Sequence, residues 1–114
     1  MVKELEDGSV TSPAGYSAAG IHAGIKAPPA KDLALVYSDN LASAAAVYTT
    51  NRVQAAPIAV DRKHLHDGKA QALIVNSGNA NACTGAGGRG DAETMCTATA
   101  SALGIAAEQV LVCS

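Results

Sequence analysis

A polar loop that contains three asparagines is the part of the chain best equipped for chemistry. It reads Asn-Ser-Gly-Asn-Ala-Asn-Ala-Cys-Thr-Gly over residues 76–85, after the apolar run 72–75 and before a helix-like segment. Asparagine and glycine also form ordinary turns, but this loop is longer than a turn requires. Its amides and hydroxyls offer donors and acceptors where an open α/β sheet binds its ligand. We therefore predict a substrate-binding loop with candidate residues Asn76, Ser77, Gly78, Asn79, Asn81 and Thr84.

Four segments of the chain share their pattern and order with a known family. They are residues 18–26, 31–36, 47–57 and 76–85. Together they resemble the ornithine acetyltransferases, also called glutamate N-acetyltransferases of arginine biosynthesis, with Tyr48 where other members carry Phe. The resemblance implies an α/β fold: a layered sandwich of mixed β-sheets with flanking helices, as in the self-cleaving, N-terminal-nucleophile-like acetyltransferases and aminopeptidases.

The same resemblance implies a reaction in two steps. A threonine exposed by self-cleavage takes acetyl from N-acetylornithine and passes it to glutamate, with its own amine as the base and an oxyanion hole for the developing charge. The family's Thr-Gly oxyanion pair and its nucleophile are expected after Ser114, so we assign no catalytic residue to this chain. The resemblance implies that the loop 76–84 lies near that pair and orients the substrate or supports the oxyanion donors. Residues 1–114 are then the N-terminal portion of one acetyltransferase domain. Downstream sequence of the α chain, or the β chain of the same precursor, completes it, and the portion alone is inactive.

Other residues with reactive or charged side chains are weaker candidates. Arg52 has the chemistry to pair with a substrate carboxylate and is a second-tier candidate. His64 and His66 lack a third ligand, so we predict a solvated segment and no metal. Cys83 has no histidine beside it, which favours an inert, buried thiol over a nucleophile. We expect His22, between apolar residues, to be partly buried with its hydrogen bonds satisfied.

Three other functions compete with the acetyltransferase. Residues 85–90 satisfy the pattern G-x-G-x-x-G and suggest a dinucleotide site, but they do not follow a strand directly, and we expect these glycines to shape a loop. A nucleotide would then raise the melting temperature. A related amidase or aminopeptidase would hydrolyse its acyl intermediate, and a non-catalytic fragment would only complete a scaffold. We expect no cofactor.

Composition excludes several classes of partner. The net charge is −2 with scattered basic residues, which argues against nucleic-acid binding. No stretch is apolar enough to span a membrane, and the acidic start does not resemble a leader, so we expect a cytoplasmic protein. Hydrophobic residues make up 48%, but many are alanine and neither Phe nor Trp occurs. Such a core must pack closely or be completed by another segment.

Local patterns predict the elements that position the loop. We expect strands at residues 16–26, 31–37, 44–49, 58–60, 72–75 and 110–113, with 31–37 and 44–49 as a possible hairpin and 72–75 in the centre of the sheet. Asp61 is the expected cap of a helical turn that ends at Gly68. A helix is expected from an Asp91 cap to Gly104, buried through Ala92, Met95, Cys96, Thr99, Ala102 and Leu103. The strands on either side of it would be parallel if they share a sheet.

Overall fold

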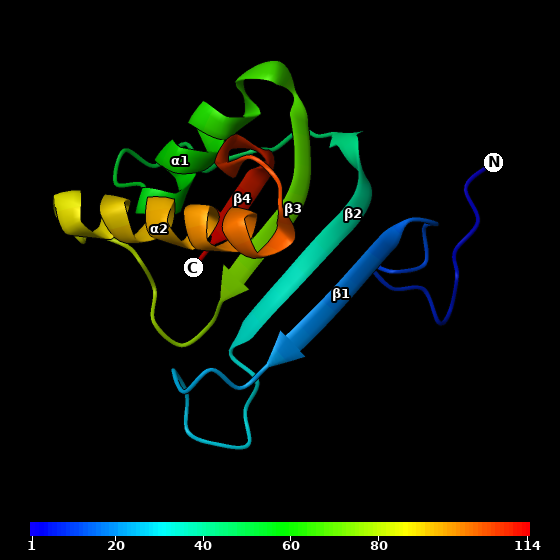
Figure 1. Cartoon of the computed structure of the whole chain (residues 1–114), viewed down its shortest axis with the longest axis horizontal. Helices are drawn as coiled ribbons and strands as arrows, with labels where there is room; N and C mark the ends of the chain where they lie inside the picture. Colours follow the sequence, from blue (N-terminus) through cyan, green and yellow to red (C-terminus); the bar gives the residue numbers. More distant parts are fainter.

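Four strands form one mixed sheet in the computed structural model, which describes residues 1–114. Across the sheet they lie in the order β1 (Tyr16–Ile21), β2 (Leu33–Ser43), β3 (Lys69–Asn76) and β4 (Val110–Cys113) (Figure 1). β2 is antiparallel to β1 and to β3, whereas β3 and β4 are parallel. The parallel pair confirms the predicted crossover, and β3 occupies the interior position that its apolar run indicated.

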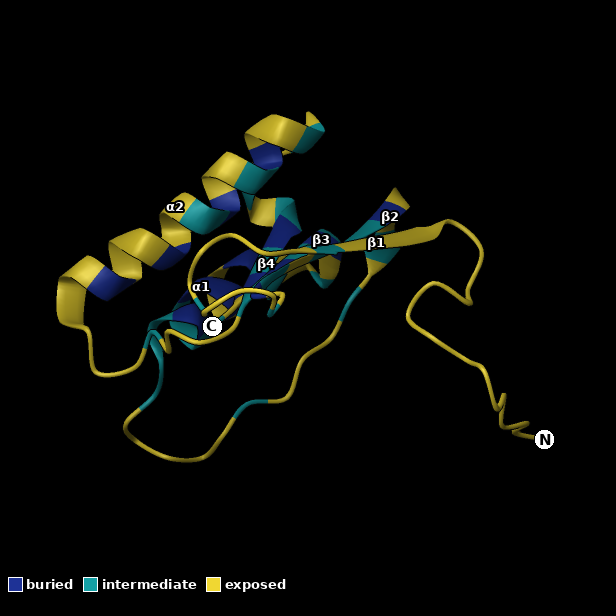
Figure 2. Cartoon of the chain, turned by 90° about the horizontal axis from the view of Figure 1, so that it is seen from below, coloured by how far each residue is buried: buried dark blue, intermediate teal, exposed yellow.

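Two helices complete the core. α2 (Gly85–Leu103) lies across one face of the sheet, and α1 (Ala56–His64) packs against both α2 and β4 (Figures 1 and 2). Short 3₁₀ turns follow α1 (Leu65–Asp67) and precede β4 (Ala107–Gln109). The buried cluster consists of small and β-branched side chains: Val60, Ala72, Ile74, Ala92, Cys96, Ala100, Val110 and Val112. Because α2 buries alanine and cysteine at four-residue spacing, it can lie close to the strands.

The other face of the sheet is only partly covered. Side chains alternate along a strand, so Ile74 is buried beneath the helices while its neighbours Leu73 and Val75 remain partly exposed. The irregular segment 44–55 passes on this second side (Figure 2). Between it and the sheet is a mainly apolar hollow of about 460 Å³, with Leu73 and Leu111 in its wall.

Several predicted strands were wrong. β1 ends at Ile21, and β2 runs on to Ser43, so residues 44–49 form no strand and no hairpin with 31–37. Their β-branched and aromatic residues have strand propensity but no neighbouring strand here, and Val47 is 99% exposed. Residues 58–60 are helical, because Pro57 lies in the first turn of α1, where its missing N–H costs nothing.

The start of α2 also differs from the prediction. The helix begins at Gly85, so Asp91 lies inside it and is not its cap. Ala102 is exposed, and Ala100 is buried in its place. The predicted stops are confirmed, since Gly68 and Gly104 both have left-handed backbone conformations at the ends of their helical segments.

Asp61 and His64 hold the outer edge of β4. Asp61 lies inside α1 and accepts a 2.9 Å hydrogen bond from the Val112 N–H, so it is not the predicted cap. His64 is buried rather than solvated, and its Nδ1 donates to the Val110 carbonyl over 2.7 Å. The two side chains lie three residues apart on one helix face and therefore meet alternate residues of the strand.

Two substitutions of Asp61 should distinguish the effect of its hydrogen bond on stability from the effect of its charge. Burial raises the pKa of this carboxyl, while the Val112 hydrogen bond and His64 oppose the rise. With a folded pKa above 3.8, the contribution of this group is greatest below pH 3.8 and is lost as pH rises through the folded pKa. D61N keeps a hydrogen-bond acceptor but does not titrate, so its stability should not show this decrease as pH rises. D61A should cost about 1–3 kcal/mol, because the Val112 N–H is then buried without a partner. Urea unfolding of both variants across pH measures each effect, and equal stability for the two would contradict the hydrogen bond.

No helix of the chain combines the length and hydrophobicity needed to cross a membrane.

Candidate functional site

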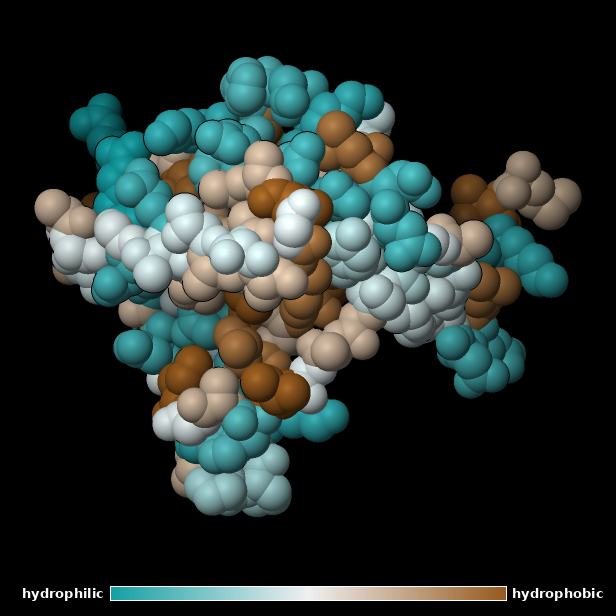
Figure 3. Space-filling view, in the orientation of Figure 1, coloured by the Kyte–Doolittle hydropathy of each residue, from teal (hydrophilic) through white to brown (hydrophobic).

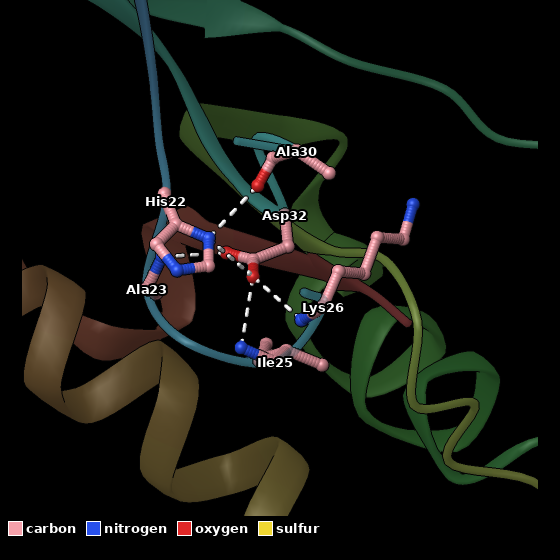
Figure 4. Close-up of polar contacts among 6 residues, drawn as sticks. All are labelled: His22, Ala23, Ile25, Lys26, Ala30 and Asp32. Atoms are coloured by element: carbon pink, nitrogen blue, oxygen red, sulfur yellow. Dashed lines mark hydrogen bonds and ion pairs between the residues drawn. The ribbon is translucent and has the colours of Figure 1, made fainter. Parts of the chain in front are cut away.

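A buried carboxylate organises the loop between β1 and β2. The side chain of Asp32 accepts hydrogen bonds from the backbone N–H groups of Ala23 at 2.6 Å, Ile25 at 2.8 Å and Lys26 at 2.8 Å (Figure 4). These bonds, with that of Lys26 first, lower the pKa of the Asp32 carboxyl, so the anion is the form that fits. Asp32 therefore fixes the shape of residues 22–31.

His22 contributes to the same arrangement. Its Nδ1 lies 2.9 Å from the Ala30 carbonyl oxygen, which can only accept, and 3.4 Å from the Asp32 carboxylate (Figure 4). Nδ1 has a hydrogen-bond partner as predicted, but the residue is exposed rather than partly buried, with 35% of its side chain accessible. Asp32 also binds the neighbouring loop, because its carbonyl accepts a 2.9 Å bond from the Ser77 N–H. The loop after β1 and the asparagine loop after β3 are thus joined.

Asn81 is the centre of the asparagine loop. Its carbonyl accepts from the Ala56 N–H at 3.1 Å, at the start of α1. Its Nδ2 donates to the Gly88 carbonyl at 2.6 Å, and its Oδ1 accepts from the Thr84 hydroxyl. One asparagine therefore joins the loop to the first turns of both helices. The side-chain amide of Asn76 closes the loop's first turn by donating to the Asn79 carbonyl at 3.0 Å.

The glycines of the G-x-G-x-x-G pattern are helical residues, contrary to the predicted loop. Gly88 is buried in α2, and a Cβ there would collide with the side chains of Thr84 and Asn81. Gly87 and Gly90 have open space at the same position. Gly88 occupies a variable position of the pattern, whereas a Cβ at Gly85, the remaining glycine of the pattern, would also meet open space. The close packing contact therefore does not depend on the pattern, whose glycines lie in a helix and not in a turn that holds a pyrophosphate.

The two loops, the middle of α2, the first residue of β2 and the end of β4 border a hollow of about 400 Å³. Its apolar wall lies between α2 and the loop after β1, where the space-filling view shows hydrophobic surface (Figure 3). Ala23, Ile25, Leu33, Ala80 and Met95 form that wall, and the polar lining is Asn76, Asn79, Asn81, Thr84, Asp91 and Ser114. An apolar cavity with a few convergent polar groups suits a small polar molecule with a short aliphatic stem.

The structure brings four of the six candidate residues of the loop to this hollow: Asn76, Asn79, Asn81 and Thr84. Ser77 and Gly78 do not line it, and Gly78 instead packs against the Lys26 side chain with a φ of 99°. Arg52 is exposed in the irregular segment and lies outside it. Sequence reasoning missed the support that Asp32 and Ser114 give to the site, because their partners are backbone groups, which no residue pattern marks.

The remaining candidates have no part in this hollow. Cys83 is exposed rather than buried and has a φ of 56°. Cys96 is buried, and burial raises the pKa of its thiol to about 12, so it stays protonated at neutral pH. No three His, Cys, Asp or Glu side chains lie together as metal ligands would. The Arg62 guanidinium lies over the ring of Tyr48, 5.0 Å from the ring centre. The Tyr48 hydroxyl is buried without a hydrogen-bond partner.

Comparison with known proteins identifies the family. The sequence model of the ArgJ family matches residues 17–114. The chain belongs to the ArgJ family. It is 53% identical over 111 residues to the arginine biosynthesis bifunctional protein ArgJ of Caldanaerobacter subterraneus subsp. tengcongensis, covering 97% of this chain and 27% of that protein. The Gloeobacter violaceus ArgJ is 54% identical over 112 residues, which cover 97% of this chain and 28% of the relative. The chain thus spans little more than a quarter of these relatives.

Solved ArgJ structures share the fold. The crystal structure of ArgJ from Bacillus halodurans matches with a TM-score of 0.91 at 51% identity, covering 95% of this chain and 56% of that one. The ornithine acetyltransferase of Mycobacterium tuberculosis, complexed with ornithine, matches with a TM-score of 0.90 at 46% identity, covering 96% and 60%. The predicted fold class is confirmed: this chain has part of the N-terminal-nucleophile-like α/β fold of ArgJ proteins.

Proposed function

We propose that these residues are the N-terminal portion of a glutamate N-acetyltransferase that moves acetyl from N-acetylornithine to glutamate in arginine biosynthesis. The observation that carries the proposal is the 46% identity and TM-score of 0.90 to an ornithine acetyltransferase complexed with ornithine. The 400 Å³ hollow is consistent with it. Ornithine has aliphatic methylenes suited to the apolar wall and polar ends suited to amides and carbonyls. We propose no cofactor, nucleic-acid partner or membrane partner.

In this proposal the chain binds and orients, and later residues react. The nucleophilic threonine and the Thr-Gly oxyanion pair follow Ser114, which lies at the end of β4 and lines the hollow. The reacting groups would then enter the site from the strand end. Asn76, Asn79, Asn81 and Thr84 would orient the substrate beside them, and a fixed polar surface of this kind lowers the reorganisation needed in the transition state.

The partly covered sheet face supports completion by further sequence. Leu73 and Leu111 line a mainly apolar hollow, and the nearby segment 44–49 has strand propensity without a partner. We propose that the remaining α-chain sequence and the β chain, both products of self-cleavage, pack on this side. The complete protein would be a cytoplasmic heterotetramer.

A mass-spectrometric experiment tests this function. The complete protein is incubated with N-acetylornithine, and the intact mass of every polypeptide is measured under denaturing conditions. We expect a companion chain that begins with threonine and carries one added acetyl unit, which glutamate then removes. Residues 1–114 should stay unmodified and, when isolated, should show no turnover. Acetyl release to water without glutamate would instead indicate an amidase, and the absence of any acetyl-enzyme would refute the two-step mechanism.

A further inference from the structure

The hydroxyl of Ser114 joins the end of β4 to the asparagine loop. It accepts a hydrogen bond from the Asn81 N–H at 3.0 Å and donates one to the Asn79 carbonyl at 2.9 Å. Both loop residues and Ser114 itself line the 400 Å³ hollow. A single oxygen therefore links the strand end directly to the polar wall of the site.

The loop end of this connection is firmly held. Asn81 is bonded to the start of α1 through the Ala56 N–H and to α2 through the Gly88 carbonyl. The Asn76 amide holds the Asn79 carbonyl from the other side. Because the loop is anchored at both residues that Ser114 contacts, the hydroxyl connects two rigid bodies. Removing it should loosen their relative position more than it weakens either one.

We propose that Ser114 is a positioning residue for acyl transfer. It does not act on the substrate, but holds the Asn79–Asn81 wall at a fixed place relative to the residues that follow β4. This role rests on the proposed function. A misplacement of about 1 Å at a reacting centre can reduce a rate about a hundredfold. The loss should fall on kcat and leave the KM for N-acetylornithine nearly unchanged, because the loop keeps its own hydrogen bonds to α1 and α2 and can still bind the substrate.

The test compares S114A, S114T and S101A in the complete acetyltransferase. Ser101 is an exposed residue of α2 whose side chain makes no hydrogen bond in the structure, so S101A controls for loss of a serine hydroxyl. We expect S114A to lower kcat roughly ten- to a hundredfold, with S114T restoring most of it and S101A unchanged. The backbone N–H of Asn81 donates to Ser114, and its hydrogen exchange should become faster in S114A alone.

The outcomes distinguish the positioning role of Ser114 from the proposed acetyltransferase function on which it rests. Faster exchange at Asn81 with unchanged kcat would show a bond without a positioning role and would overturn the inference. A fall in kcat that S114T fails to restore would overturn it too, since the hydroxyl would not be the cause. If the unsubstituted protein neither binds ornithine nor transfers acetyl, the proposed function fails and the role falls with it.

Discussion

Replacing Gly88 with alanine should destabilise the protein by roughly 3 kcal/mol, of which overpacking accounts for about 1–3 and a lost hydrogen bond for about 1. The new methyl group would collide with the side chains of Thr84 and Asn81. Thr84 cannot move without losing its bond to Asn81, and Asn81 cannot move without losing the Gly88 carbonyl. The clash is therefore passed to the whole asparagine loop.

The same helix provides a matched control. Gly87 is the preceding residue; it is exposed, and open space surrounds the position that a Cβ would take. G87A should stabilise the protein by about 0.5–1 kcal/mol, because alanine loses less backbone entropy than glycine on entering a helix. Urea unfolding of the two variants measures the contrast. Equal effects at the two positions would show that the loop does not pack on α2 as described.

Loss of the Asp32 carboxylate should release the loop after β1. In D32A, the N–H groups of Ala23, Ile25 and Lys26 lose their shared acceptor. We expect these amides to exchange with solvent roughly ten- to a hundredfold faster, since hydrogen bonds to charged groups are among the stronger ones. D32N should speed up the exchange of these amides almost as much, because the NH₂ group of the new asparagine would face a backbone N–H donor. D39N changes an exposed aspartate whose side chain makes no hydrogen bond, and should alter little.

The acid limb of stability gives a second readout for Asp32. Its pKa is lower in the folded protein than the ordinary 3.8, chiefly because of the backbone N–H groups whose hydrogen bonds it accepts. Its contribution is therefore complete above pH 3.8 and is lost as pH falls through the folded pKa. D32N should unfold with less dependence on pH in that range. An acid limb that D32N and the unsubstituted protein share would contradict the lowered pKa.

The local pattern of apolar residues predicted correctly those strands whose formation does not depend on an unforeseen neighbour. The apolar runs at 72–75 and 110–113 became neighbouring parallel strands, since each is covered by helices on at least one face. Residues 47–49 also have strand propensity, yet a strand needs a neighbour for its backbone groups, and a sequence pattern cannot reveal whether one is present. Residues 58–60 were too short a run to separate helix from strand, and Pro57 decided the outcome.

Some residues of the site could likewise be predicted from the sequence, and others could not. The asparagine loop was recognisable because its polar residues are contiguous, and four of its six candidate residues line the hollow. Asp32 and Ser114 were not recognisable, because an isolated polar residue gives no sign of which backbone groups it will meet. The prediction for His64 was wrong for a related reason: its neighbours in sequence are charged, but its partner is the Val110 carbonyl, 46 residues away.

The side chains that bind the outer edge of β4 also determine which edge of the sheet can pair with another strand. Asp61 and His64 already occupy the Val112 N–H and the Val110 carbonyl, which an incoming strand would need. β1, at the opposite rim, has no such guard, and five of its six residues are exposed. Backbone groups that a further strand could pair with, whether it comes from the same polypeptide or from another, are thus available at the β1 edge of the sheet and not at the β4 edge.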